Sequence, residues 1–264
     1  MEKSNTKIAL VTGAASGLGF ELALLLAKDG YSLILIDIDA IKLEQAKSNI
    51  LKRYQVNVIL IIKDLSRVNI AKEIYDAIKN TKIDVVINNA GFGLFGTFYD
   101  TDWERESQML HLHILTTTHL IKLILPDMIE RGSGKILNLS SLAAFQPGPL
   151  MALYYASKAY LLSFSEAISN ELKGTGVTVT VLCPGPTKTS FQEVVSEGSH
   201  ENKIAFNMAC AEEVAAYGYR AMQKGKVVAI PGFLNKCLSV LPRILTRNRT
   251  TKIVRKIQDK NRDV

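Results

Sequence analysis

Thr12-Gly13-Ala14-Ala15-Ser16-Gly17-Leu18-Gly19 is the stretch that decides the fold of this chain. It follows the apolar run Ile8-Ala9-Leu10-Val11 and opens a helical pattern from Phe20 to Ala27. A strand, a glycine-rich turn and a helix in this order are typical of a dinucleotide site. The glycines permit a tight turn and a close backbone approach, and the helix N-terminus attracts a pyrophosphate.

The rest of the chain alternates short apolar runs with amphipathic segments, which predicts a parallel sheet wrapped by helices on both faces. We expect one α/β domain, Rossmann-like and doubly wound, with about seven parallel strands. The strands are expected near Ile8, Leu33, Val58, Val85, Ile136, Val179 and Val228, and the helices near Leu22, Leu43, Ile74, Leu115, Leu161 and Val214.

Length and composition fit one soluble enzyme domain. The chain has 264 residues, of which 47% are hydrophobic and 22% charged. The N-terminus lacks the apolar core of a signal peptide, and the three cysteines are odd in number without metal-like spacing. We therefore expect a cytoplasmic protein with reduced thiols and no metal site.

The net charge of +7 is concentrated at the C-terminus. Residues 236–264 contain nine Lys or Arg and two Asp, interleaved with apolar residues. We divide the chain into a Rossmann-like dinucleotide-binding domain, 1–235, and a basic amphipathic tail, 236–264. The tail suits an interfacial helix that touches an anionic membrane peripherally. Packing on the domain or on a sister subunit is an equal alternative, and nucleic-acid binding is not expected because no reader motif accompanies the charge.

Tyr154 and Lys158 stand four residues apart in a helical segment, so a phenol and an ammonium share one face. A neighbouring cation lowers the pKa of a tyrosine, which favours its use as a general acid or base. Ser141, thirteen residues upstream of the tyrosine, follows a strand and can hold a substrate oxygen. The adjacent residues Ser140 and Tyr155 are the alternatives for the roles of Ser141 and Tyr154.

Together with Asn88-Asn89-Ala90-Gly91 and Pro184-Gly185, these motifs give a chain that resembles the short-chain dehydrogenase/reductase family from about Lys7 to Pro231. The resemblance implies that Tyr154 exchanges a proton with the substrate, that Lys158 lowers the pKa of the tyrosine and binds the nicotinamide ribose, and that Ser141 orients the carbonyl or alcohol. It implies direct hydride transfer to or from a nicotinamide cofactor. Besides Tyr154 and Lys158, the expected cofactor residues are Gly13, Ser16, Gly17, Leu18, Gly19, Asp37, Asp64, Leu65, Asn89, Ala90, Gly91, Pro184, Gly185, Thr187 and Thr189.

Asp37 selects the cofactor in our interpretation. It ends a strand eighteen residues after Gly19, where a carboxylate can accept hydrogen bonds from the adenine ribose and repel a 2′-phosphate. No Arg or Lys follows it immediately, and position 16 is Ser. We therefore expect NAD, with NADP as the alternative.

His113 departs from the family pattern. Relatives place an asparagine thirteen residues before the proline that corresponds to Pro126, where it anchors a water in a proton relay to the lysine. His113 either replaces it in that relay, as a further catalytic residue with a pH dependence, or is a packed helix residue.

The substrate is expected to be a lipophilic secondary alcohol or ketone, because apolar residues flank the motifs and no Arg or Lys stands beside Ser141 or Tyr154 in the sequence. The expected wall comprises Phe92, Phe95, Phe145, Leu150 and Met151. The segment from Thr187 to Phe206 is expected to form a substrate lid.

Two further hypotheses stay open at this stage: an NADPH-dependent carbonyl reductase, and a nucleotide-sensing or membrane-associated binding protein with weak activity. Family resemblance also implies a homodimer or tetramer, through the helices near Leu115 and Leu161.

Overall fold

The strands form one seven-stranded parallel sheet. The computed structural model describes residues 6–189 and 208–262, and within these the strand order is β3-β2-β1-β4-β5-β6-β7, with every neighbouring pair parallel. This confirms the expected sheet and all seven strand positions. The strands are β1 (Ile8–Thr12), β2 (Ser32–Asp37), β3 (Val58–Ile62), β4 (Val85–Asn88), β5 (Gly134–Leu139), β6 (Val177–Leu182) and β7 (Val228–Ala229).

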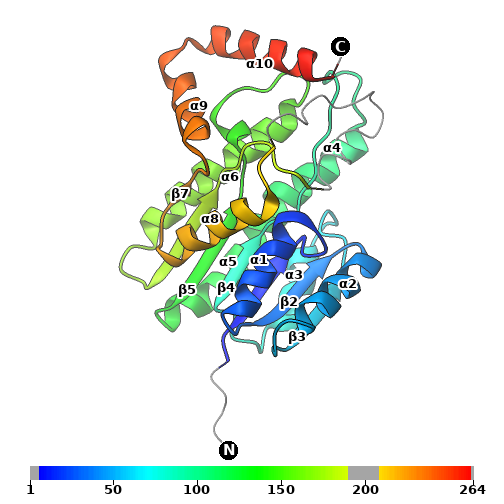
Figure 1. The fold of residues 1–264 in the computed structure, drawn as a ribbon, viewed down its shortest axis with the longest axis vertical. Helices are drawn as coiled ribbons and strands as arrows, with labels where there is room; N and C mark the ends of the chain where they lie inside the picture. Colours follow the sequence, from blue (N-terminus) through cyan, green and yellow to red (C-terminus); the bar gives the residue numbers. More distant parts are fainter. Residues whose placement is uncertain (1–5, 190–207, 263–264) are drawn as a thin grey trace, which may run out of the picture.

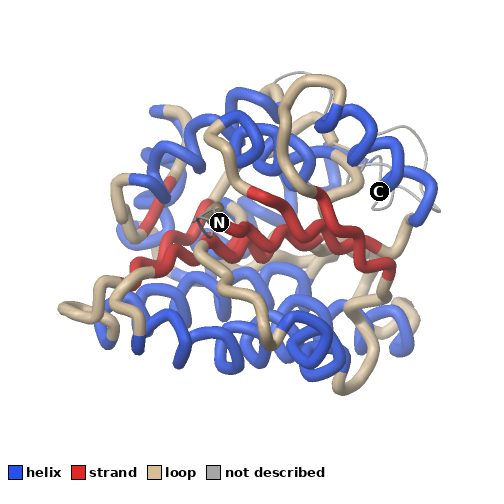
Figure 2. Tube along the Cα trace, turned by 90° about the horizontal axis from the view of Figure 1, so that it is seen from below, coloured by secondary structure: helices blue, strands red, loops and turns tan. Residues whose placement is uncertain are grey.

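Helices cover both faces of the sheet, which Figure 2 shows as a band between two helical layers. Core contacts place α1, α2 and α8 on one face, and α3, α5 and α6 on the other. The helical elements are α1 (Gly17–Lys28), α2 (Ala40–Leu51), α3 (Ile70–Ile78), α4 (Trp103–Leu110), η1 (His111–Thr116), α5 (Thr117–Glu130), η2 (Leu142–Phe145), α6 (Ala152–Glu171), α8 (Ala211–Gln223), α9 (Phe233–Ile244) and α10 (Arg247–Arg262).

The two faces are built from alternate residues of each strand, as the two-residue period of a strand requires. In β1, Ala9 and Val11 pack in the cluster under α1 and α8, whereas Leu10 packs in the cluster under α3 and α5. All three are fully buried, so the strand reads as a continuous apolar run.

The strand order reverses at β1, which pairs with β2 on one side and β4 on the other. Ligands of open parallel sheets bind beside the carboxyl ends of the strands at such a point. The motif residues after β1, β4, β5 and β6 therefore meet at one edge of the sheet, the upper edge in Figure 1.

The helix expected near Leu115 is present but contains a π-helical segment, η1, between α4 and α5. The hydroxyl of Thr117 donates to the carbonyl of Leu112 over 3.1 Å, five residues back. Single π turns inside α-helices occur frequently at functional sites, and this one carries His113.

The C-terminal residues form two helices, α9 and α10, above the carboxyl edge of the sheet (Figure 1). The expected boundary between residues 235 and 236 falls inside α9. Thr250, Val254 and Gln258 of α10 are each less than 9% exposed, so this helix packs onto the domain. None of the helices in the described part of the chain has the length and apolar character needed to span a bilayer.

Candidate active site

The glycine turn between β1 and α1 depends on the absence of side chains. Gly13 and Gly17 have positive φ angles of 62° and 54°, which favour glycine. A Cβ atom on Gly19 would lie 2.0 Å from the carbonyl oxygen of Gly13 and 2.5 Å from Nδ2 of Asn89. Glycine at these positions therefore lets the turn fold tightly on itself and pack against Asn89.

Asn89 and Thr12 hold this turn against the end of β4. Nδ2 of Asn89 donates to the carbonyls of Thr12 and Gly13 over 3.0 and 2.9 Å. Oγ1 of Thr12 accepts from the backbone N–H groups of Asn89 and Ala90. Hydrogen bonds thus join the glycine turn after β1 to the loop that follows β4.

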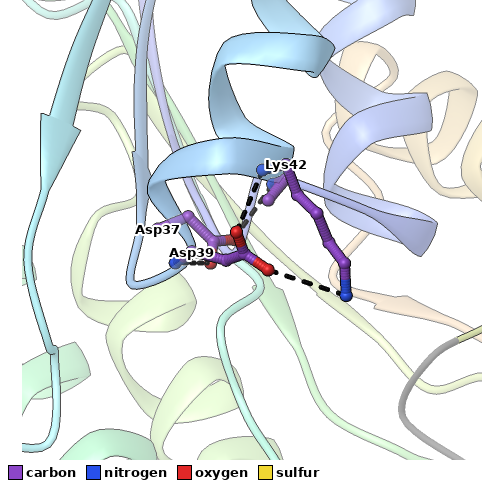
Figure 3. A network of polar contacts seen from close by, with 4 residues as sticks. Asp37, Asp39 and Lys42 are labelled. Carbon is purple, nitrogen blue, oxygen red and sulfur yellow. Dashed lines mark hydrogen bonds and ion pairs between the residues drawn. The ribbon is translucent and has the colours of Figure 1, made fainter.

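Asp37 lies at the end of β2, beside the glycine turn. Its Oδ2 accepts from the N–H of Ala15 over 2.9 Å, and its Oδ1 accepts from the N–H of Asp39 over 3.1 Å (Figure 3). The carboxylate therefore has a fixed position, and it lines the cavity described below.

Two lysines near Asp37 were not predicted from the sequence as residues of the site. Lys42 lies 3.6 Å from Asp39, with which it pairs (Figure 3), and Lys63 pairs with Glu73. Both line the same cavity, although neither follows Asp37 immediately in the chain. Lys42 lies in the first turn of α2, five residues after Asp37, a spacing that could have identified it.

A single cavity of about 800 Å³ runs along the carboxyl edge of the sheet. It brings together almost all the expected cofactor residues. Those that line it are Gly13, Ser16, Gly17, Leu18, Asp37, Asp64, Leu65, Asn89, Ala90, Gly91, Tyr154, Lys158, Pro184, Gly185, Thr187 and Thr189. Gly19 does not line it and instead packs against Gly13 and Asn89. The lid was expected from Thr187 to Phe206, and its residues from 190 onward lie outside the part of the chain that the structure describes.

Ser141, Tyr154 and Lys158 meet in this cavity. Ser141 caps the short helix η2 by accepting from the N–H of Ala143 over 3.1 Å. Nζ of Lys158 lies 5.7 Å from the centre of the Tyr154 ring and donates to the carbonyl of Leu139 over 3.0 Å. Tyr154 and Lys158 are 9% and 4% exposed, so both side chains lie largely out of water.

Burial dominates the ionisation of both groups. It raises the pKa of Tyr154 above its usual value, and a hydrogen bond from Ser141 only partly offsets this. The expectation that Lys158 gives a net lowering of this pKa was therefore wrong for the protein alone. Burial also lowers the pKa of Lys158 to about 8.

The neighbouring serine and tyrosine have structural partners. The hydroxyl of Ser140 donates to the carbonyl of Lys158 over 2.8 Å. The hydroxyl of Tyr155 accepts from Nε2 of Gln258 over 2.9 Å. The geometry thus favours Ser141 and Tyr154 as the chemical pair.

His113 is packed inside the domain and does not line the cavity. Its Nε2 accepts from the N–H of Phe92 over 3.3 Å, so Nδ1 carries the proton toward Oγ of Ser157 at 2.9 Å. Burial, and then the charge of Lys158, lower the pKa of His113 well below its usual value. The relay alternative needed titration near neutral pH, which this lowered pKa disfavours, and these contacts favour the alternative of a packed residue. A Cβ atom on Gly91 would lie 2.6 Å from Nε2 of His113, which explains why this position holds a glycine.

The apolar wall differs in part from the one expected. Phe92 and Met151 line the cavity. Phe95 packs beside them without lining it, Phe145 packs against a cluster around Cys183, and Leu150 is buried. The missing wall comes from the C-terminal helices and their junction, through Leu238, Leu241, Pro242, Leu245, Thr250, Ile253, Val254, Ile257 and Gln258.

A basic side chain from α4 lines the cavity beside Phe92. Arg105 lines the cavity and lies 4.8 Å from the centre of the Phe92 ring. The sequence indicated no basic residue beside Ser141 or Tyr154, because Arg105 is distant from both in the chain.

The family model for short chain dehydrogenase matches residues 7–200. The chain belongs to the short-chain dehydrogenase family. It is 31% identical over 261 residues to the very-long-chain 3-oxoacyl-CoA reductase of Anas platyrhynchos, covering 95% of this chain and 80% of the duck protein.

Two solved short-chain dehydrogenases share the fold. One, from Sphingobium yanoikuyae in complex with NADPH, has a TM-score of 0.80 and 24% identity, covering 91% of this chain and 97% of that one. Another, from Burkholderia phymatum in complex with NAD, has a TM-score of 0.81 and 21% identity, covering 92% and 95%. The family membership makes this short-chain dehydrogenase an oxidoreductase that acts on CH–OH groups.

Proposed function

We propose that the protein is an NAD(H)-dependent oxidoreductase that interconverts a lipophilic secondary alcohol and the corresponding ketone. One observation carries the proposal: a single cavity joins the glycine turn and Asp37 to the buried group of Ser141, Tyr154 and Lys158.

The residues present fit a nicotinamide dinucleotide. The turn at Gly13 and Gly17 leaves backbone open at the N-terminus of α1, where N–H groups and the helix dipole favour a pyrophosphate. Asp37 can accept hydrogen bonds from ribose hydroxyls, while Asp64 and Leu65 border the adenine end. When bound, the nicotinamide gives or takes the hydride.

Tyr154 is the proton donor in ketone reduction. Because burial raises the pKa of its phenol, the group is protonated at neutral pH and can give its proton to the developing alkoxide. Ser141 orients the substrate oxygen by a hydrogen bond. The largely cationic Lys158 stabilises the phenolate that remains, since opposite charges interact strongly away from water.

Asp37 supports NAD over NADP, because a fixed carboxylate beside the adenosine site repels a 2′-phosphate. Lys42 and Lys63 keep an NADPH-dependent reductase as the second candidate, since their ammonium groups could offset that repulsion. The related folds in complex with NADPH and with NAD are compatible with either cofactor.

The substrate is proposed to be a long acyl chain with a 3-oxo group, or a compound of similar shape. The wall of Met151, Leu238, Leu241 and Ile253 suits an alkyl chain. Arg105 could bind an anionic carrier joined to it. The name of the duck relative supports the same class of compound.

Self-association is proposed through the outer face of α5 and α6 and the preceding η1 segment. Leu115 is 55% exposed there, and Tyr160 is 37% exposed and stacks on Phe164. Leu161, which marked the position of the second helix in the sequence, is buried and cannot contribute. Light scattering after gel filtration measures the state, and a monomer would contradict the proposal.

The function is tested by titrating the purified protein with NADH and NADPH, followed by turnover of 3-oxoacyl thioesters and bulky ketones of increasing length. We expect tighter NADH binding and NADH oxidation that depends on the ketone. Tighter NADPH binding would overturn the cofactor proposal, and cofactor binding without turnover of any ketone would overturn the proposed reaction.

A further inference from the structure

Helix α9 presents an apolar stripe to the outside of the molecule. Phe233, Cys237, Val240 and Ile244 follow one another at intervals of four, three and four residues, so they share one helical face. Phe233, Val240 and Ile244 are 82%, 49% and 78% exposed, and Cys237 is exposed too. We call these four residues the outer stripe.

A second apolar stripe, on α9 and on Leu245 directly after it, lines the cavity. Leu238, Leu241 and Leu245 repeat at intervals of three and four residues, about a quarter-turn from the outer stripe, and all line the cavity. The opposite side of α9 packs on the domain, where Ser239 is buried and Asn235 lies close to Gly185. The apolar surface of α9 is thus continuous from the outside of the molecule into the substrate site.

Helix α10 adds positive charge beside it. Its packed face carries Thr250, Val254 and Gln258. Arg249, Lys252 and Lys256 lie on the opposite face and are exposed. This charge lies at the same end of the molecule as α9, since the two helices follow one another above the carboxyl edge of the sheet (Figure 1).

We propose that α9 and α10 form a docking surface for an anionic lipid bilayer. Bulky apolar side chains next to exposed Lys and Arg are the composition that settles a helix at the boundary between headgroups and acyl chains. Each Lys or Arg near an anionic surface adds to the attraction, and the apolar stripe adds burial that charge alone does not provide. Charge complementarity therefore selects a membrane over a second copy of this chain, whose own helices would present the same positive charge.

Docking in this way places the cavity beside the bilayer. A lipophilic substrate could then pass from the membrane along Leu238 and Leu241 to Tyr154 without crossing water. This consequence rests on the proposed function, whereas the docking does not.

The test is sedimentation of the full chain with sucrose-loaded vesicles of phosphatidylcholine, with or without phosphatidylglycerol. We expect binding to the anionic vesicles that weakens as salt is raised, and little binding to the neutral ones. Phe233→Ser with Ile244→Ser should weaken binding at least about tenfold, as should Arg249→Gln with Lys252→Gln and Lys256→Gln.

Matched controls lie at exposed positions on α2 and just after the ends of α2, α3 and α6. Ile41→Ser with Leu51→Ser changes the exposed apolar residues of α2, and Lys52→Gln with Lys79→Gln and Lys173→Gln removes three exposed charges elsewhere. Both should bind vesicles as the wild type does, and thermal unfolding should show that all variants are folded. The proposal is overturned if the wild type does not prefer anionic vesicles or if the tail variants bind as well as the controls. It is also overturned if the outer-stripe variant changes a dimer to a monomer without affecting vesicle binding. Because NADH binding is measured separately, failure here leaves the proposed function untouched.

Discussion

Nε2 of Gln258, in the last helix of the chain, donates a 2.9 Å hydrogen bond to the hydroxyl of Tyr155, the residue that follows Tyr154. The same amide lies 3.8 Å from the sulfur of Met151. The C-terminal helix is thus held against the start of α6, where the proposed proton donor is positioned.

Replacing Gln258 by Leu should loosen α10 from the substrate site. We expect the KM for a lipophilic ketone to rise about three- to tenfold with a smaller change in kcat, because a buried hydrogen bond contributes about 1 kcal/mol. Steady-state kinetics measure both constants. Lys256→Leu, on the exposed face of the same helix, is the control. An unchanged KM in Gln258→Leu would argue against a role for α10 in binding substrate.

Asp37→Asn should relax the choice of cofactor. The amide keeps an oxygen that can accept from the N–H of Ala15, but it no longer repels a 2′-phosphate. We expect the ratio of NADH to NADPH affinity to fall at least about tenfold, measured by fluorescence titration. Asp39→Asn, which changes the charge two residues further on, should alter the ratio less. Equal effects would mean that net charge, and not Asp37, sets the preference.

Lys158 should make stability rise with pH in a defined window. In the folded protein its pKa is lowered to about 8, against 10.5 for an ordinary lysine. Between these values the unfolded chain binds more protons, so the free energy of unfolding increases with pH, by up to about 1.4 kcal/mol per pH unit. Urea unfolding of the wild type and of Lys158→Met across this window isolates the effect. Parallel curves for the two proteins would show that Lys158 is not desolvated.

His113→Asn should lower stability by about 1–3 kcal/mol, because the groups that pair with the two ring nitrogens, Ser157 and the N–H of Phe92, lose a buried partner. The wild type should also lose stability as pH falls below about 6.5, since the unfolded histidine then binds a proton that the buried one does not. Chemical unfolding measures both effects, with the exposed His119→Asn as control. A step in activity near pH 6.5 that His113→Asn abolishes would contradict the packed role and revive the relay.

The sheet, and the position of Tyr154 and Lys158 in one cavity, could be predicted because their signals are local. The glycine turn from Gly13 to Gly19 lies within one strand–turn–helix unit, and the spacing of Tyr154 and Lys158 lies within one helix. Parallel topology then brings the ends of distant strands together without further information. These are the parts in which the sequence and the structure agree.

The rest depends on long-range packing, which short windows of sequence do not encode. Arg105 and Lys42 reach the cavity only because α4 and α2 dock beside it. The sequence predicted a tail, 236–264, separate from the domain, whereas residues of α9 and α10 line the cavity and Gln258 pairs with Tyr155. Phe145 and Leu150 adjoin the motifs in sequence but turn into the protein. The pKa of Tyr154 follows its burial, which the four-residue spacing to a lysine does not reveal.

The most direct test of the central claim compares the wild type and Tyr154→Phe in NADH oxidation driven by a ketone, with NADH affinity measured on the same samples. The account predicts that turnover falls at least about a hundredfold while NADH affinity stays within about threefold, because only the proton donor is removed. Turnover at the wild-type rate in Tyr154→Phe would contradict it.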